Sequence, residues 1–150
     1  MTTAINRTRR LVLWAIPAIV ALGGGAFGAK MLLPPPAGLD YSLTRTSENG
    51  SFTATVEPAT DPIVIDQVQT WTIAVANADG SSPDLSDITV DGGMPQHGHG
   101  LPAEPRVTRD LGGGRFEVEG MLFSMSGWWV VNVHVETAEG EDQAVFNFQL

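Results

Sequence analysis

The sequence predicts an all-β domain, a sandwich of about seven to nine strands, preceded by one N-terminal transmembrane helix. Three observations support this prediction. Residues 11–29 carry no charged side chain. After residue 40, apolar and polar residues alternate with a period of two in several segments, as in strands with one buried face. Gly, Asn and Asp residues that favour turns separate these segments.

The first 39 residues are basic and apolar. They contain Arg7, Arg9, Arg10 and Lys30 and no acidic residue. A helix over residues 11–29 would be roughly 28 Å long, close to the ~30 Å apolar core of a bilayer. Because most of the positive charge precedes this segment, we expect residues 1–10 to be cytoplasmic and residues 11–33 to form a signal anchor.

A cleaved signal peptide is the alternative interpretation of this segment. Ala26 and Gly28 would supply the small side chains needed before a cut after Gly28. In both cases the remaining chain is exported. Residues 34–39 begin with three prolines and are expected to form a Pro-rich linker. The predicted location is the inner membrane, crossed once, with the C-terminal domain in the periplasm or outside the cell.

Residues 40–150 are predicted to form the β-domain. Turn signals every few residues and one apolar face per strand are typical of an immunoglobulin-like β-sandwich, and a small barrel is the alternative. Trp71 and Trp129 are the candidates for its largest core side chains. The expected strands are residues 41–46, 52–56, 63–65, 71–76, 88–90, 106–109, 115–119, 129–135 and 145–150.

Composition excludes several functions. Residues 40–150 contain 4 basic and 17 acidic side chains, which argues against nucleic-acid binding because phosphates require clustered Lys and Arg. The chain has no cysteine, so disulfides, Cys-based zinc sites, iron–sulfur clusters and cysteine nucleophiles are excluded. The acidic residues near the last turn are expected to be a solvated surface; they are Glu136, Glu139, Glu141 and Asp142.

The segment of residues 91–105, DGGMPQHGHGLPAEP, is expected to be a loop between strands. His97 and His99 are two positions apart, which puts both imidazoles on one side of an extended backbone. Pro95 and Pro102 restrict the two ends of the loop and lower the entropy cost of ordering its side chains. A restricted loop bearing histidines on a rigid sandwich is a common place for a binding site.

Methionines accompany the histidines. Met94, Met121 and Met125 lie in or near the same region of the sequence. Thioether sulfur is soft and imidazole is borderline, so a His/Met set favours copper, Cu(I) above all. The candidate metal ligands are His97, His99, Met94, Met121 and Met125. Alternatively, the histidines are ordinary loop residues and Met121 and Met125 fill gaps in the core. His134 is expected to be a surface histidine.

The run from Gly92 to Trp129 resembles the YtkA-like family of small exported bacterial domains, which is related to the FixH-like proteins. The likeness lies in MPQHGHG, LPAEPRVT, a Gly-rich turn, EGMLFSM and the Gly-Trp pair that follows. The resemblance implies an immunoglobulin-like, copper-handling domain of the cell envelope that aids copper delivery or assembly of an oxidase or cation pump. Several family members carry a further histidine where Ser124 stands, which implies that Met121 and Met125 complete the site here.

The sequence therefore predicts a membrane-anchored, copper-binding domain that is not an enzyme, because no nucleophile, base and orienting group occur together. The expected partners are the membrane, through the N-terminal helix, and a membrane protein or copper-receiving protein. The alternative is a metal-free interaction module of a membrane complex, docked through HGHGLP and Trp128.

Overall fold

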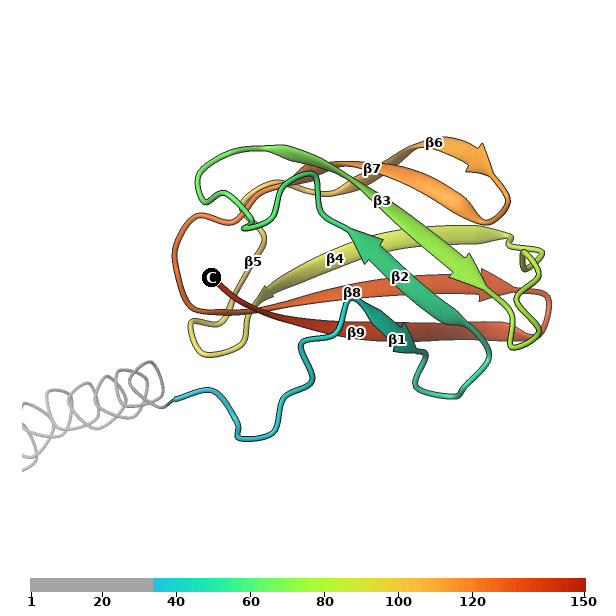
Figure 1. Ribbon diagram of the computed structural model, residues 1–150, viewed down its shortest axis with the longest axis horizontal. Helices are drawn as coiled ribbons and strands as arrows, with labels where there is room; N and C mark the ends of the chain where they lie inside the picture. The colour runs from blue at the N-terminus through green and yellow to red at the C-terminus, as the bar shows by residue number, and fades with distance from the viewer. Residues whose placement is uncertain (1–33) are drawn as a thin grey trace, which may run out of the picture. The chain divides into compact units, whose positions relative to one another are not determined.

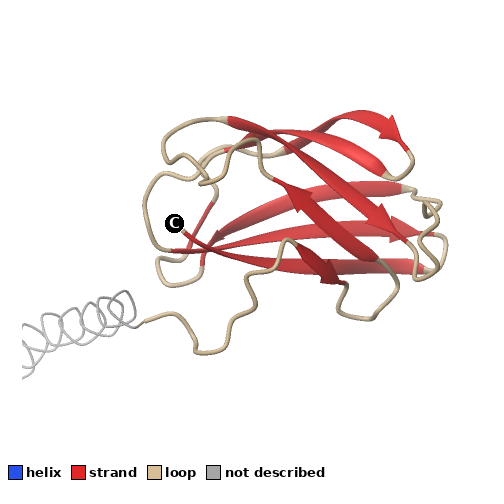
Figure 2. Cartoon of the chain, in the orientation of Figure 1, coloured by secondary structure: helices blue, strands red, loops and turns tan. Residues whose placement is uncertain are grey.

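A computed structural model of the protein describes residues 34–150. The predicted basic N-terminus, residues 1–10, and the predicted transmembrane helix, residues 11–33, lie outside the described residues. Within residues 34–150 the chain consists of strands and loops (Figure 2), and residues 35–150 form one compact unit. No helix in this described part is long and apolar enough to cross a membrane.

One of the two sheets has five antiparallel strands. Their order across the sheet is β1-β2-β3-β7-β6 (Figure 1). Because β3 pairs with β7 rather than with β4, the chain crosses to the second sheet after β3 and returns at β6. The five strands are β1 (Thr44–Thr46), β2 (Thr53–Glu57), β3 (Gln69–Ala76), β6 (Arg106–Gly112) and β7 (Arg115–Met121).

The second sheet has four antiparallel strands in the order β5-β4-β8-β9. They are β4 (Asp87–Met94), β5 (His99–Gly100), β8 (Trp128–Thr137) and β9 (Gly140–Gln149). The all-β class is confirmed, and the nine strands of the described part agree with the predicted number. The two sheets remain separate, so the barrel alternative does not hold.

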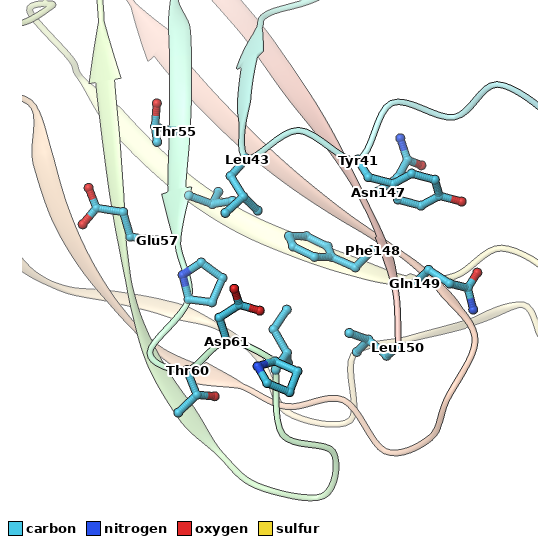
Figure 3. Close-up of a pocket in the computed structure, with 14 residues that line it drawn as sticks. Tyr41, Leu43, Thr55, Glu57, Thr60, Asp61, Asn147, Phe148, Gln149 and Leu150 are labelled. Carbon is cyan, nitrogen blue, oxygen red and sulfur yellow. The ribbon is translucent and has the colours of Figure 1, made fainter.

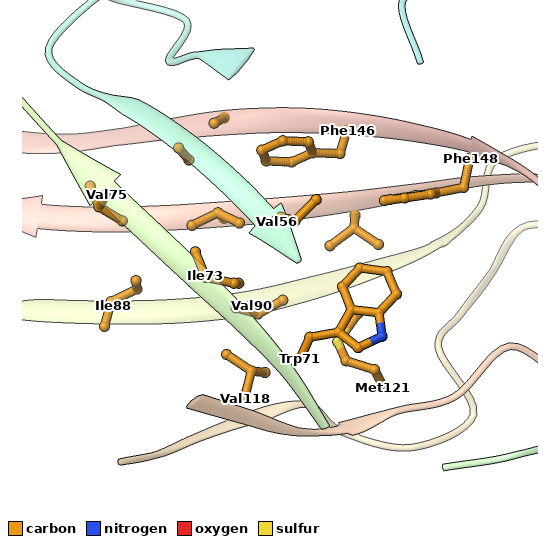
Figure 4. Close-up of a cluster of buried hydrophobic side chains, with 14 of the residues drawn as sticks. Val56, Trp71, Ile73, Val75, Ile88, Val90, Val118, Met121, Phe146 and Phe148 are labelled. Atoms are coloured by element: carbon orange, nitrogen blue, oxygen red, sulfur yellow. The ribbon is translucent and has the colours of Figure 1, made fainter. Parts of the chain in front are cut away.

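The core lies between the sheets and is formed by the alternating apolar residues of both (Figure 4). The predicted core residues Trp71 and Trp129 are 1% and 0% exposed. Phe123, from the segment between β7 and β8, packs between them, with ring centroids 5.6 Å from Trp71 and 5.3 Å from Trp129. Tilted and edge-to-face ring contacts of this kind stabilise a core beyond the area they bury.

Two predictions about local secondary structure were wrong. Residues 63–65 form no strand, because the hydrogen bonds of this region are not part of a ladder: the Gln69 side chain donates to the Val64 carbonyl, and Asp66 N–H donates to the Phe123 carbonyl. The alternation there arises because Ile63 packs against the core from a loop. Residues 91–105 are not a continuous loop, since residues 91–94 complete β4 and residues 99–100 form β5.

The predicted solvated acidic surface is wrong for Asp142, which is 7% exposed. The loop between β1 and β2 covers its carboxylate. Asn49 N–H donates to it at 3.1 Å, and the Ser51 hydroxyl donates at 2.7 Å. Burial alone would raise the pKa of Asp142, but these hydrogen bonds, with the Ser47 hydroxyl, hold it well below its ordinary range. Asp142 therefore stays ionised and ties β9 to the other sheet.

Candidate metal centre

The two predicted ligand histidines lie on a hairpin formed by β4 and β5, at the same end of the sandwich as the C-terminus (Figure 1). Met94 pairs with His99 across the hairpin. The N–H groups of His97 and Gly98 close the turn by donating to the Met94 carbonyl at 3.1 and 2.9 Å. Gly98 has φ +71°, a conformation that favours glycine.

The hairpin brings the two imidazoles and one thioether together. Residues paired across antiparallel strands project their side chains to the same face, so the Met94 and His99 side chains are neighbours. Met94 is 1% exposed, whereas His99 is exposed. The His97 ring, carried by the turn, lies 5.8 Å from the His99 ring between centroids. The Met94 thioether therefore lies on the buried side of the site, and the two imidazoles lie on the side nearer to solvent.

A hydrogen bond fixes the tautomer of His99. Its Nδ1 lies 3.0 Å from the carbonyl oxygen of Gly100. A carbonyl oxygen only accepts, so Nδ1 is the donor in this bond, and in the neutral tautomer that makes it Nε2 carries the lone pair. Metal-binding histidines usually donate their second ring N–H to such a carbonyl or carboxylate, which fixes the ring orientation and strengthens the free nitrogen as a ligand.

The start of β8 and the segment that precedes it form the opposite side of the site. The Trp129 ring meets the His99 ring edge to face, with centroids 5.8 Å apart. Trp129 Nε1–H donates to the Met125 carbonyl at 3.0 Å, which holds the Met125 backbone beside this pair. The Met125 side chain is 39% exposed. Sequence reasoning placed Trp129 only in the core; its contact with a candidate ligand comes from the fold.

Met121, unlike the residues of the histidine hairpin, belongs to the five-stranded sheet. It ends β7, pairs with Gln69 of β3 and is 0% exposed, beside Trp71 in the core (Figure 4). The structure therefore brings Met94, His97 and His99 together on one hairpin and holds the Met125 backbone next to them through Trp129. Met121 is enclosed among core side chains.

The donor set fits a soft metal ion. Metal–nitrogen bonds of about 2.0–2.1 Å on each side of an ion are compatible with two imidazole centroids 5.8 Å apart. A thioether beneath them adds the soft donor that copper accepts more readily than calcium or magnesium. In residues 34–150, no group of three or more His, Cys, Asp or Glu side chains is arranged to hold a metal.

The third histidine lies elsewhere. His134, on β8, has Nε2 at 3.2 Å from Asp91 and Nδ1 at 3.7 Å from Glu141. Its side chain is 24% exposed, so it is half-buried between strands β4 and β9 rather than a free surface residue. The same Asp91 carboxylate accepts a hydrogen bond from Asn132 at 2.7 Å. These contacts join three neighbouring strands across the outer face of the sheet.

An apolar groove of about 600 Å³ lies apart from the histidines, between β2 and the end of β9 (Figure 3). Tyr41, Leu43, Phe148 and Leu150 are among the residues that line it. None of the five candidate ligands lines it. Its lining includes the carboxylate of Asp61 but no imidazole or thioether group. The groove and the candidate metal centre are therefore separate features.

Together, the two antiparallel sheets and the histidine hairpin define a small all-β domain with a candidate soft-metal site at one end. The sequence model of the YtkA-like family matches residues 45–134, more than half of the chain, and the protein belongs to this family. The match covers the whole histidine hairpin and Trp129. Neither a search of curated proteins nor a search of solved structures found a match.

Proposed function

We propose that the protein is a membrane-anchored, periplasmic copper-binding domain that hands on its metal and catalyses no reaction. The observation that carries the proposal is the Nδ1–H hydrogen bond of His99, because it leaves Nε2 of this exposed residue as the nitrogen that can bind a metal. His97 and His99 would supply imidazole nitrogen, and Met94 would supply thioether sulfur. Met125, on the exposed side of the site, is a further thioether within the same loops.

Partial exposure suits transfer better than permanent storage. His99 and the Met125 side chain are exposed, whereas Met94 is enclosed. A partner could therefore reach the metal from the histidine side and replace the ligands one at a time. Copper delivery, or assembly of a copper-containing oxidase, is the role that we propose for this arrangement.

A competition titration tests copper binding directly. The full chain is titrated with Cu(I), and separately with Cu(II), against a chromophoric chelator of known affinity. We expect the double variant His97→Ala, His99→Ala to lose Cu(I) affinity by at least about a hundredfold, since both nitrogen ligands are removed. Unchanged affinity in this variant would refute the assignment.

His134→Gln provides the matched control. This variant also removes an imidazole from the four-stranded sheet, but from the group formed with Asp91 and Glu141. We expect it to bind Cu(I) like the unmodified protein. A loss confined to His134→Gln would move the copper site to the outer face of the sheet.

The second candidate, a metal-free interaction module, is favoured by exposed apolar residues at the same end. Val64, Val68 and Met125 are 41%, 62% and 39% exposed. Their loops are connected, since Asp66 N–H donates to the Phe123 carbonyl at 2.8 Å. A membrane protein that co-purifies with the chain in the presence of chelator, and with both histidines replaced, would support this function instead.

The anchor is part of the proposal. Residues 11–29 carry no charge and follow three arginines, which supports a retained signal anchor with the domain outside the cytoplasm. We expect the chain to remain in the membrane fraction after alkaline extraction. A mature N-terminus at Ala29, found by N-terminal sequencing, would instead show cleavage.

A further inference from the structure

The beginning of β8 carries two residues that the proposed function leaves without a role. Gly127, just before the strand, and Trp129 are two positions apart, so both face the inside of the sandwich. Gly127 continues the β8–β9 ladder, because its N–H and carbonyl bond the carbonyl and N–H of Leu150 at 2.7 and 3.0 Å. Their positions relative to the hairpin are therefore set by the sheet itself.

Gly127 leaves the space that the Met94 side chain occupies. A Cβ added at Gly127 would lie 2.6 Å from the terminal methyl of Met94, closer than carbon atoms approach. Gly127 also has φ +137°. An alanine at position 127 would require this methyl to shift, and the thioether sulfur bonded to it would move as well.

Trp129 supports the His99 ring from inside. Its indole is fully buried and cannot turn, because Nε1–H is bonded to the Met125 carbonyl and Phe123 packs against its ring at 5.3 Å between centroids. The His99 imidazole rests edge to face on this fixed surface, at 5.8 Å. The Gly100 carbonyl and the indole together restrict the rotation of the His99 ring.

We propose that Gly127 and Trp129 are positioning residues of the metal site, where Gly127 places the Met94 thioether and Trp129 orients His99. The inference rests on the proposed copper-binding function. It has a consequence for specificity, because the buried indole and the buried thioether put no oxygen donor on the inner side of the site. Cu(II) favours tetragonal nitrogen and oxygen ligands, so this inner wall selects Cu(I).

Trp129→Phe tests the role of the indole, and Trp71→Phe is its matched control. Trp71 is equally buried, contacts the same Phe123 and also loses an N–H bond, to Gln69 Oε1, but it has no contact with a histidine among the ring contacts of the described residues. We expect Trp129→Phe to lower Cu(I) affinity about tenfold or more and to lower the ratio of Cu(I) to Cu(II) affinity. Trp71→Phe should change neither quantity.

Gly127→Ala tests the role of the glycine, and Gly140→Ala is its control. Gly140 has nearly the same backbone angle, φ +132°, with no atom within 4 Å of an added Cβ. Both variants carry the same backbone strain, and only Gly127→Ala displaces Met94. We expect Gly127→Ala alone to lower Cu(I) affinity, and to have no further effect in a Met94→Leu background.

Measurements without metal test the positioning role of Gly127 and Trp129 separately from the proposed copper-binding function. Long-range ¹H–¹⁵N spectra of the metal-free full chain report the His99 tautomer, and methyl spectra report Met94. Shifts in Trp129→Phe and Gly127→Ala, absent from both controls, are expected. If these shifts occur but the unmodified chain binds no copper, the proposed function fails and the positioning contacts stand. If the unmodified chain binds Cu(I) and these variants bind it equally well, the positioning proposal is wrong.

Discussion

At the scale of single residues, Asp142 contributes stability through charge-assisted hydrogen bonds between the two sheets. We expect Asp142→Asn to lower the free energy of unfolding at pH 7 by about 1–3 kcal/mol, because its carboxylate accepts bonds from Asn49 N–H and Ser51 that an amide satisfies less well. Urea denaturation followed by tryptophan fluorescence measures this. Glu139→Gln, at the exposed turn beside it, is the control and should leave stability unchanged.

The pH dependence of this effect has a definite sign. The folded-state pKa of Asp142 is lowered from its ordinary value of 3.8. Its contribution is therefore complete above that value and is lost as the pH falls through the folded pKa. The stability difference between the unmodified protein and Asp142→Asn should shrink progressively below about pH 4. A difference that grows on acidification would contradict this account.

The methionines make a second prediction at this scale. Met94→Leu should lower Cu(I) affinity, because it removes the thioether beneath His99. Met121→Leu should leave Cu(I) affinity unchanged and cost less than about 1.5 kcal/mol of stability, since it replaces one core side chain by another of similar volume. The competition titration compares both variants. Equal losses of affinity would instead place Met121 among the ligands.

At the scale of elements, the β6–β7 hairpin depends on one glycine more than on its neighbour. Gly114 and Gly113 have φ +73° and +64°. The Gly114 carbonyl accepts the Val75 N–H at 2.8 Å, and a Cβ at Gly114 would overlap the Val75 carbonyl oxygen, whereas one at Gly113 meets no atom within 4 Å. Of these two turn glycines, only Gly114 contacts β3.

We expect Gly113→Ala to cost about 1 kcal/mol of stability from left-handed backbone strain. Gly114→Ala should cost at least about twice as much, because backbone strain is joined by an overlap with backbone atoms that cannot move aside. Thermal unfolding of the two variants, measured side by side, gives the comparison. Equal costs would show that the turn at Gly114 moves away from β3 without penalty.

Elements with a long apolar alternation were predictable. The segments 71–76, 129–135 and 145–150 correspond to β3, β8 and β9, because each buries one face along its whole length. The two-residue strand β5 has no periodic pattern and exists only through its pairing with Gly93 and Met94. Local sequence cannot reveal a strand that is defined by its partner.

At the scale of the whole molecule, the fold separates charge between the sheets. All four arginines of the described residues lie in the five-stranded sheet. There, Arg109 pairs with Glu117 and Arg115 pairs with Glu57, each at 2.8 Å. The strands of the four-stranded sheet contain no Lys or Arg; their acidic residues are Asp87, Asp91, Glu136, Glu141 and Asp142.

This imbalance predicts a response to salt. Raising NaCl from about 10 to 150 mM shortens the screening length from roughly 30 to 8 Å. We expect the free energy of unfolding to rise, because 17 acidic and 4 basic residues in residues 40–150 make the repulsion between carboxylates stronger than the attraction within ion pairs. Urea denaturation at the two concentrations tests this, and Glu136→Gln should show a smaller rise. A lower free energy of unfolding in salt would mean that attraction within the arginine ion pairs outweighs the repulsion between carboxylates.

The sequence by itself determined the all-β class, the tryptophan core, the family and the residues of the candidate site, because burial periodicity and residue chemistry are local properties. Only the tertiary structure decided which candidates meet. His97, His99 and Met94 converge because two strands pair across a four-residue turn, and Met121 is enclosed because β7 pairs with β3. The burial of Asp142 and the support of His99 by Trp129 also arise from contacts between residues distant in sequence, which no local pattern encodes.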